Sequence, residues 1–211
     1  MKQIVWTAAM LAGIGIITGC QSFSDRVRCA VTPNMEYCNG VIVEEMLLDD
    51  TPYNREYKMP GKMEELKYIT IHNTWNVAPA INERTYLNNR QDNEYISFHY
   101  AVDESGAIRI LPDDQRGWHA GDGANGPGNS SSIGIEICRS RCYDEQEELY
   151  RKAEANAVLL AAWLLDQHNL PMSALKKHQD WNDKYCPHRI LDENRWNEFV
   201  ENVKKARKNQ E

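Results

Sequence analysis

The sequence lacks an excess of positive charge. It has 24 lysine and arginine residues against 31 aspartate and glutamate residues, and its formal net charge at pH 7 is −7. Residues 1–19 contain one charged side chain, Lys2, so the chain without them would carry −8. Proteins that bind nucleic acid neutralise phosphates with clusters of basic side chains. The charge balance therefore argues against a nucleic-acid partner.

The sequence also lacks an apolar run of about 20 residues, the length that crosses a bilayer as a helix. Its longest apolar run, from Ile4 to Ile17, follows Lys2 and ends in Thr18-Gly19-Cys20. This pattern predicts an export signal over residues 1–19. The last residues of the run resemble a bacterial lipobox, which implies that Cys20 is lipidated. A plain signal peptide and an uncleaved anchor are the alternatives.

The same resemblance suggests a location. In lipoproteins of Gram-negative bacteria, a residue other than aspartate after the lipidated cysteine usually implies the outer membrane, and Gln21 stands there. We therefore expect a protein of the cell envelope, attached to the membrane through its N-terminal lipid and facing the periplasm.

Cysteine is scarce, with six residues in the chain. If Cys20 carries lipid, an odd number is left in a compartment that permits disulfides, so one of them is expected to have another role. The remaining cysteines are Cys29, Cys38, Cys138, Cys142 and Cys186.

The length of 211 residues suits one domain with a proper core, and no internal repeat is visible. We expect residues 20–60 to form a tether and an irregular wrapping segment, and residues 61–211 to form the domain. Short β-branched runs and two long amphipathic stretches predict an α/β fold, with a central mixed sheet flanked by helices. The expected strands are 68–71, 96–102, 107–111 and 133–137, and the expected helices are 82–93, 147–168 and 193–208.

Two histidines and one cysteine form a plausible metal-binding set. His72 ends the first expected strand, and His178 precedes Cys186 by eight residues. Catalytic zinc sites use three protein ligands and leave a position for water. The glycine-rich stretch 121–126 matches the G-x-G-x-x-G pattern of dinucleotide-binding proteins. In those proteins the pattern follows a strand and opens a helix, and neither is expected here, so the stretch does not indicate nucleotide binding.

Four segments resemble the type 2 N-acetylmuramoyl-L-alanine amidase family, which includes phage lysozyme-amidases and is similar to peptidoglycan recognition proteins. The segments are Ile69–Thr74, Ser97–Val102, Gly117–Gly121 with Ser132–Glu136, and His178–Trp181 with Lys184–Arg189. Their order and spacing are specific, and they span more than half of the chain. The resemblance implies an α/β domain with a zinc site at one edge of the sheet.

Position by position, the resemblance implies one Zn²⁺ per chain, bound by His72, His178 and Cys186. It also implies that Glu136 and Lys184 are catalytic. His119 matches a histidine of the family's substrate cleft, so we expect it to bind substrate. Some phage members have a catalytic tyrosine before the second-strand histidine and lack the strand glutamate. Phe98 stands at that tyrosine position here, so acid–base work is assigned to Glu136 and not to Tyr100.

Elementary chemistry supports these roles. A carboxylate near a metal can take a proton from water and pass it to a leaving amine, and an ammonium can stabilise the developing oxyanion. The alternatives are a structural ion pair for Glu136 and a solvated side chain for Lys184. We expect His99 to be a buried hydrogen-bonding residue rather than a ligand, and Asp180 to support the site.

The remaining cysteines predict two short-range disulfides, Cys29–Cys38 and Cys138–Cys142. The alternative is that Cys138 is a buried thiol at a strand end. The expected function is zinc-dependent hydrolysis of the amide between N-acetylmuramic acid and L-alanine, in peptidoglycan or in muropeptides, by a monomer. The alternatives are a non-catalytic peptidoglycan-binding module on the same fold, and hydrolysis of another amide or ester.

Overall fold

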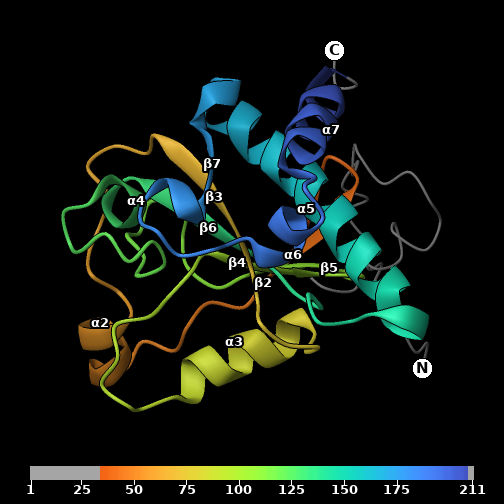
Figure 1. Ribbon diagram of the computed structural model, residues 1–211. Helices are drawn as coiled ribbons and strands as arrows, with labels where there is room; N and C mark the ends of the chain where they lie inside the picture. The colour runs from red at the N-terminus through yellow and green to blue at the C-terminus, as the bar shows by residue number, and fades with distance from the viewer. Residues whose placement is uncertain (1–33, 209–211) are drawn as a thin grey trace, which may run out of the picture.

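A computed structural model describes residues 34–208 (Figure 1). Its seven-stranded mixed sheet has the order β1-β2-β5-β4-β6-β3-β7. The strands are β1 (Met35–Cys38), β2 (Val41–Glu45), β3 (Tyr68–Asn73), β4 (Tyr100–Asp103), β5 (Gly106–Arg109), β6 (Ser132–Ile137) and β7 (Leu175–Lys177). The helices are α2 (Pro52–Tyr57), α3 (Ala80–Asn89), α4 (Pro127–Ser130), α5 (Glu147–Gln167), α6 (His188–Asp192) and α7 (Trp196–Lys208), with short 3₁₀ turns η1 (Asp144–Gln146), η2 (Met172–Ala174) and η3 (His178–Asp180).

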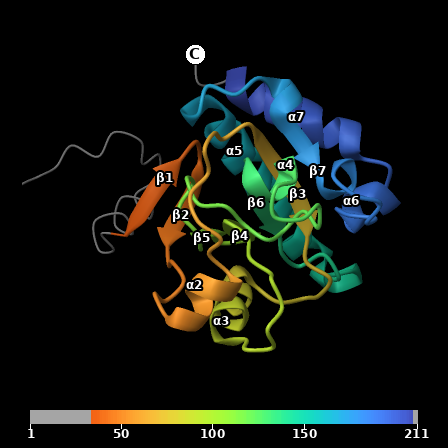
Figure 2. The same cartoon turned by 90° about the vertical axis from the view of Figure 1, so that its left-hand side faces the viewer.

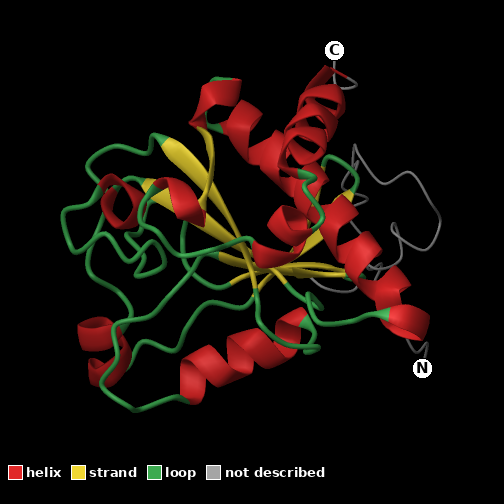
Figure 3. Ribbon diagram, in the orientation of Figure 1, coloured by secondary structure: helices red, strands yellow, loops and turns green. Residues whose placement is uncertain are grey.

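Helices lie on both faces of the sheet, as expected for the α/β class. Helices α5 and α7 lie together over one face, and α3 lies on the other (Figures 1 and 3). The expected helix 147–168 forms as α5 with a difference of one residue at its end. Its buried side chains, with those of α7, form the larger hydrophobic cluster with one face of the sheet.

The four strands β4, β6, β3 and β7 run parallel, and their registers decide which side chains share a face. Ile69 and Ile71 of β3 join the cluster under α5, as do Ile133 and Ile135 of β6. Side chains alternate along a strand, so the residues between them point to the opposite face. These are Thr70, His72, Ser132, Gly134 and Glu136. The alternation explains why an otherwise apolar strand contains a glycine and a carboxylate.

The segment expected to wrap irregularly contributes two strands instead. β1 pairs antiparallel with β2, and β2 pairs parallel with β5, so residues 35–45 complete one edge of the sheet (Figure 2). Val41 and Val43 are buried, while the charged side chains of Glu36 and Glu45 reach Arg109. Short strands with acidic residues suit a sheet edge, and that mixed composition concealed them in the sequence.

The expected Cys138–Cys142 disulfide is wrong, because both residues are free thiols in the structure. Cys138 packs in the smaller cluster beside α3, whereas Cys142 packs in the larger cluster beneath α5. The two side chains therefore lie in different cores, and a bridge requires β-carbons about 4 Å apart. Cys138 is the buried thiol of the alternative interpretation. Cys38 is also free, and its expected partner Cys29 lies outside the described residues, as does Cys20.

Residues 34–208 include no helix with both the length and the apolar character needed to cross a membrane.

Candidate metal centre and active site

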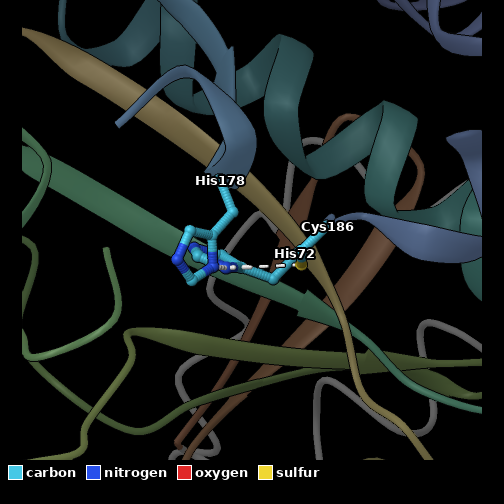
Figure 4. Close-up of side chains that lie close together, drawn as sticks. All are labelled: His72, His178 and Cys186. Carbon is cyan, nitrogen blue, oxygen red and sulfur yellow. Dashed lines mark hydrogen bonds between the residues drawn. The ribbon is translucent and has the colours of Figure 1, made fainter. Parts of the chain in front are cut away.

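His72, His178 and Cys186 converge at the carboxyl ends of adjacent parallel strands (Figure 4). His72 is the penultimate residue of β3, and His178 begins η3 directly after β7, the edge strand beside β3. Cys186 follows in the segment that leads to α6. The carboxyl ends of parallel strands are where open α/β sheets place their ligands. The expected position at one edge of the sheet is confirmed.

The three side chains are spaced as metal ligands. The Nδ1 atoms of His72 and His178 are 2.9 Å apart, and the sulfur of Cys186 is 3.9 Å from Nδ1 of His72. One ligand atom from each residue lies within 4.8 Å of the others. Tetrahedral zinc, with Zn–N of about 2.0 Å and Zn–S of about 2.3 Å, separates two nitrogen ligands by about 3.3 Å and a nitrogen from a sulfur ligand by about 3.5 Å. The arrangement therefore fits zinc with small adjustments.

Burial prepares these groups for a cation. It lowers the pKa of His72 and brings that of His178 to about 4, so both rings are neutral at pH 7 and can offer lone pairs. Burial raises the pKa of the Cys186 thiol to about 12 in the absence of a cation. A thiolate is stable at this position only beside a positive charge, so metal binding releases a proton and weakens as pH falls.

The segment between His178 and Cys186 is fixed by its own hydrogen bonds. The backbone N–H of Lys177 donates to Asp180 at 3.0 Å, and that of Gln179 donates to the carbonyl of Cys186 at 3.0 Å. The indole N–H of Trp181 donates to the Thr70 hydroxyl at 3.0 Å, which ties η3 to β3. Asp180 thus supports the turn that carries His178 and does not itself reach the metal site.

Glu136 stands beside His72 in the sheet, because the two residues are direct partners in the parallel register of β6 and β3. Its Oε2 atom is buried and accepts no hydrogen bond within residues 34–208, and it forms no ion pair in that range. Burial raises the pKa of Glu136 to about 8, the charge of Glu83 adds to the rise, and Lys184 opposes it. A nearby cation would lower this pKa again. A carboxylate without a structural partner beside a metal centre is available for proton transfer.

Lys184 is exposed and lies near the metal ligands rather than among them. It lines the same two cavities as Glu136, and its charge acts on His72 and His178. Its backbone N–H donates to Asn182 at 2.8 Å, which fixes the chain just before Cys186. The ammonium can therefore reach a substrate held beside Glu136.

His119 contacts a metal ligand as well as a cavity. Its Nδ1 atom lies 3.1 Å from Nε2 of His72, and its own Nε2 lies 3.2 Å from the carbonyl oxygen of Ser132. If His119 donates from Nε2 to that carbonyl, its Nδ1 accepts the proton of His72 Nε2–H. Nδ1 of His72 is then unprotonated and faces the metal site. The His119 ring packs on Gly134, where a β-carbon would approach it to 2.8 Å.

His99 is confirmed as a buried hydrogen-bonding residue. Its Nδ1 accepts from the backbone N–H of Gly134 at 2.9 Å, and its Nε2 donates to the carbonyl of Gln115 at 2.8 Å. Both ring nitrogens are therefore used, and His99 is fully buried. It ties β6 to the segment that follows β5, behind the site.

Two cavities meet at Glu136 and Lys184. The larger one, about 400 Å³, is called the loop cavity here; Tyr95, Trp118, His119, Gly121, Asn129 and Asn182 are among its lining residues. The smaller one, about 230 Å³, is called the α3 cavity; it is lined by Trp75, Glu83, Tyr86, Arg90, Tyr185 and His188, among others. Ile96 and Phe98 border both. A substrate that spans both cavities passes directly over the proposed catalytic groups.

The sequence alone did not identify most of these residues as part of a cavity. Trp75 and Tyr185 are single aromatics in loops, and Glu83 sits in the first turn of a helix whose other features are ordinary. The glycine-rich stretch was the one available hint. Gly121 and Gly123 both adopt positive φ, and a β-carbon on Gly121 would lie 2.4 Å from the side chain of Asn182.

The fold and the His-His-Cys centre define an α/β domain with a zinc-type hydrolase site. The family model described as N-acetylmuramoyl-L-alanine amidase matches residues 62–189, which include every ligand and Glu136. The chain belongs to this N-acetylmuramoyl-L-alanine amidase family.

Curated relatives agree over the same region. The amidase CwlA of Bacillus subtilis is 44% identical over 157 residues, covering 74% of this chain and 55% of the relative. The amidase XlyB of Bacillus subtilis is 43% identical over 166 residues, covering 79% of this chain and 50% of the relative. The chain therefore spans about half the length of the curated relatives that it matches.

A solved structure of PlyL resembles about three quarters of this chain. It superposes with a TM-score of 0.69 at 42% sequence identity, and the match covers 76% of this chain and 96% of that one. The fold of the matched region is therefore shared with PlyL.

Proposed function

We propose that the chain hydrolyses the amide bond between N-acetylmuramic acid and L-alanine in peptidoglycan or its fragments. The observation that carries the proposal is the convergence of His72, His178 and Cys186 beside the unpaired carboxylate of Glu136. Family membership supports it, because the matched region contains this whole set of residues.

Each residue has a definite task in this proposal. Zinc held by the three ligands would supply Lewis-acid activation of the scissile carbonyl and of the attacking water. Glu136 takes a proton from that water and passes it to the nitrogen of the leaving L-alanine. Lys184 stabilises the negative oxygen of the tetrahedral intermediate with its ammonium group. His119 holds the tautomer of His72 and borders the loop cavity, where it contacts substrate.

A non-catalytic peptidoglycan-binding module is the second candidate from the sequence. The free Oε2 atom of Glu136 favours catalysis over this alternative, since a module that only binds gains nothing from a buried carboxylate that lacks a partner. Hydrolysis of a different amide or an ester would use the same groups.

Purified sacculi separate these alternatives. Zinc-loaded protein should release stem peptides with free L-alanine amino termini and leave intact glycan strands, as identified by mass analysis. Binding to sacculi without release of peptide would support the non-catalytic module. Inactivity on sacculi together with turnover of simple amides or esters would point to another substrate.

We further propose that Cys20 is lipidated and attaches the protein to the cell envelope as a monomer, in the outer membrane facing the periplasm. The support is the apolar run that ends in Ile17-Thr18-Gly19-Cys20, followed by Gln21. Tethering would keep the enzyme concentrated near its substrate. Cells fed a labelled fatty acid should label the wild type and not the Cys20→Ala variant. An unlabelled wild type with a mature N-terminus elsewhere would exclude the lipid anchor.

A further inference from the structure

The two cavities that meet at the metal site differ in charge. Apart from the shared Glu136 and Lys184, the loop cavity is lined by no aspartate, glutamate, lysine or arginine side chain. The α3 cavity adds Glu83 and Arg90. The proposed substrate has the same asymmetry, because a neutral amino sugar lies on one side of the scissile amide and a charged peptide lies on the other.

Besides Glu136, which is assigned to catalysis, Glu83 is the acidic group of the α3 cavity that lacks a counter-charge. Its side chain is partly buried in the first turn of α3, and its Oε1 accepts a hydrogen bond from the side-chain amide of Asn76 at 2.7 Å. It forms no ion pair within residues 34–208. Arg90, by contrast, is paired with Asp92. Partial burial of a carboxylate is costly when no cation is close to it. A ligand ammonium would therefore supply the positive partner that Glu83 lacks.

We propose that the α3 cavity binds the stem peptide and that Glu83 receives a side-chain ammonium of that peptide. The inference rests on the proposed amidase function, and it names the preferred substrate class: stem peptides that contain a diamino acid with a free amino group. Trp75, Tyr86 and Tyr185 border the cavity and are 65%, 60% and 51% exposed. Their rings can cover the methylene stem of a diamino side chain while its charged end reaches Glu83.

A purely structural role for Glu83 makes a different prediction. A carboxylate in the first turn of a helix interacts favourably with the helix dipole, and Glu83 also holds Asn76. Removing it would then weaken the domain and slow every substrate alike. A role in ammonium binding instead changes only substrates that carry the amine. Glu83→Gln preserves the size and the acceptor oxygen, so it removes the charge and little else.

The experiment compares two muramoyl tripeptides, one with lysine at the third position and one with norleucine, which lacks the amine. The zinc-loaded wild type should have a kcat/KM about tenfold higher for the lysine peptide, mainly through KM, as expected for a charge-assisted hydrogen bond at a partly exposed site. Glu83→Gln should lower the lysine value to that of norleucine and leave norleucine within about twofold. Glu64→Gln removes an exposed charge that lines neither cavity and should preserve the preference.

Equal kcat/KM values for the two peptides in the wild type would overturn the proposal, and so would an equal loss on both in Glu83→Gln. If the wild type hydrolyses neither peptide, the proposed amidase function fails instead. Calorimetric binding of the same two peptides then still tests the subsite, because a preference that depends on Glu83 does not require turnover.

Discussion

Each nitrogen of the His72 ring has its own neighbour, and this division controls the chemistry at the residue scale. Nδ1 faces His178 and the sulfur of Cys186, while Nε2 faces His119. Glu136 extends from the adjacent strand on the same face. The ligands, the tautomer and the carboxylate are therefore set by contacts that involve very few side chains, and single substitutions should separate their roles.

Glu136→Ala should fold and keep zinc but lose activity by a factor of about 10²–10⁴, the usual contribution of a positioned acid–base group. The reason is that Glu136 is not a ligand and forms no structural ion pair in residues 34–208. Amide hydrolysis, zinc content and thermal unfolding should be measured on the same preparation. Near wild-type turnover by this variant would disprove the acid–base role.

His119→Ala should lower zinc affinity by about 10–100-fold, the range found when a group that orients a metal ligand is removed. Without the acceptor at Nδ1 of His119, the proton of His72 is free to occupy either ring nitrogen. His119→Asn offers a carbonyl oxygen in a similar place and should recover part of the affinity. Competition with a chromophoric chelator measures both variants, and an unchanged affinity in His119→Ala would exclude this positioning role.

At the scale of elements, an arginine–glutamate network holds α5, α6 and α7 together beside the ligand loop. Glu193, directly after α6, accepts hydrogen bonds from Arg151 of α5 and from Arg195, the residue just before α7. Arg195 also donates to Glu154 of α5 at 2.7 Å. Cys186 lies just before α6, so these contacts also restrain the segment that carries the third ligand.

Burial alone would raise the pKa of Glu193, but hydrogen bonds from Arg151, Arg195 and Arg189 outweigh it and lower the value to about 2. Because the folded-state pKa is below the unfolded one, this stabilisation is present above about pH 4.5 and is lost as pH falls towards 2. Glu193→Gln should cost about 1–2 kcal/mol at pH 7, after allowance for solvent screening. It should also flatten the pH dependence of the free energy of unfolding between pH 4.5 and 2.

Denaturant unfolding at several pH values measures this contribution. Glu198→Gln is a matched control, since Glu198 is more exposed and its ion pair with Arg195 is longer, at 3.6 Å. Equal, small effects of the two substitutions at pH 7 would show that the network contributes little.

At the scale of the whole molecule, the metal site joins distant parts of the chain. His72 and His178 are 106 residues apart in sequence, and Cys186 adds the segment before α6. A ligand that binds only the folded state stabilises it by mass action, by about 2.7 kcal/mol at one hundred times the dissociation constant. Zinc should therefore raise the melting temperature by about 5–10 °C for a chain of this size.

Differential scanning calorimetry of chelator-treated protein, before and after zinc is added back, tests this expectation. Cys186→Ser should show a much smaller increase, because a hydroxyl is a poorer zinc ligand than a thiolate. Identical melting temperatures with and without zinc would mean that the three residues do not form a folded-state metal site.

The sequence by itself determined the features that depend on local periodicity and on residue type. The 3.6-residue pattern of α5 predicted its bounds within one residue. The motif residues identified His72, His178 and Cys186 as ligands, and the structure brings them together. The sequence also suggested a catalytic role for Glu136, because a carboxylate interrupts an otherwise apolar strand there.

Only the tertiary structure decided the features that depend on register and on faces of the sheet. It put Cys138 and Cys142 into different cores, although they are only four positions apart in the chain. It added residues 35–45 to the sheet by pairing β2 with β5 and β1 with β2. It also brought Glu83, from a helix 53 residues before Glu136, into a shared cavity. The physical reason is that side-chain alternation is a local property, whereas strand order and cavity walls arise from contacts between segments that the sequence does not connect.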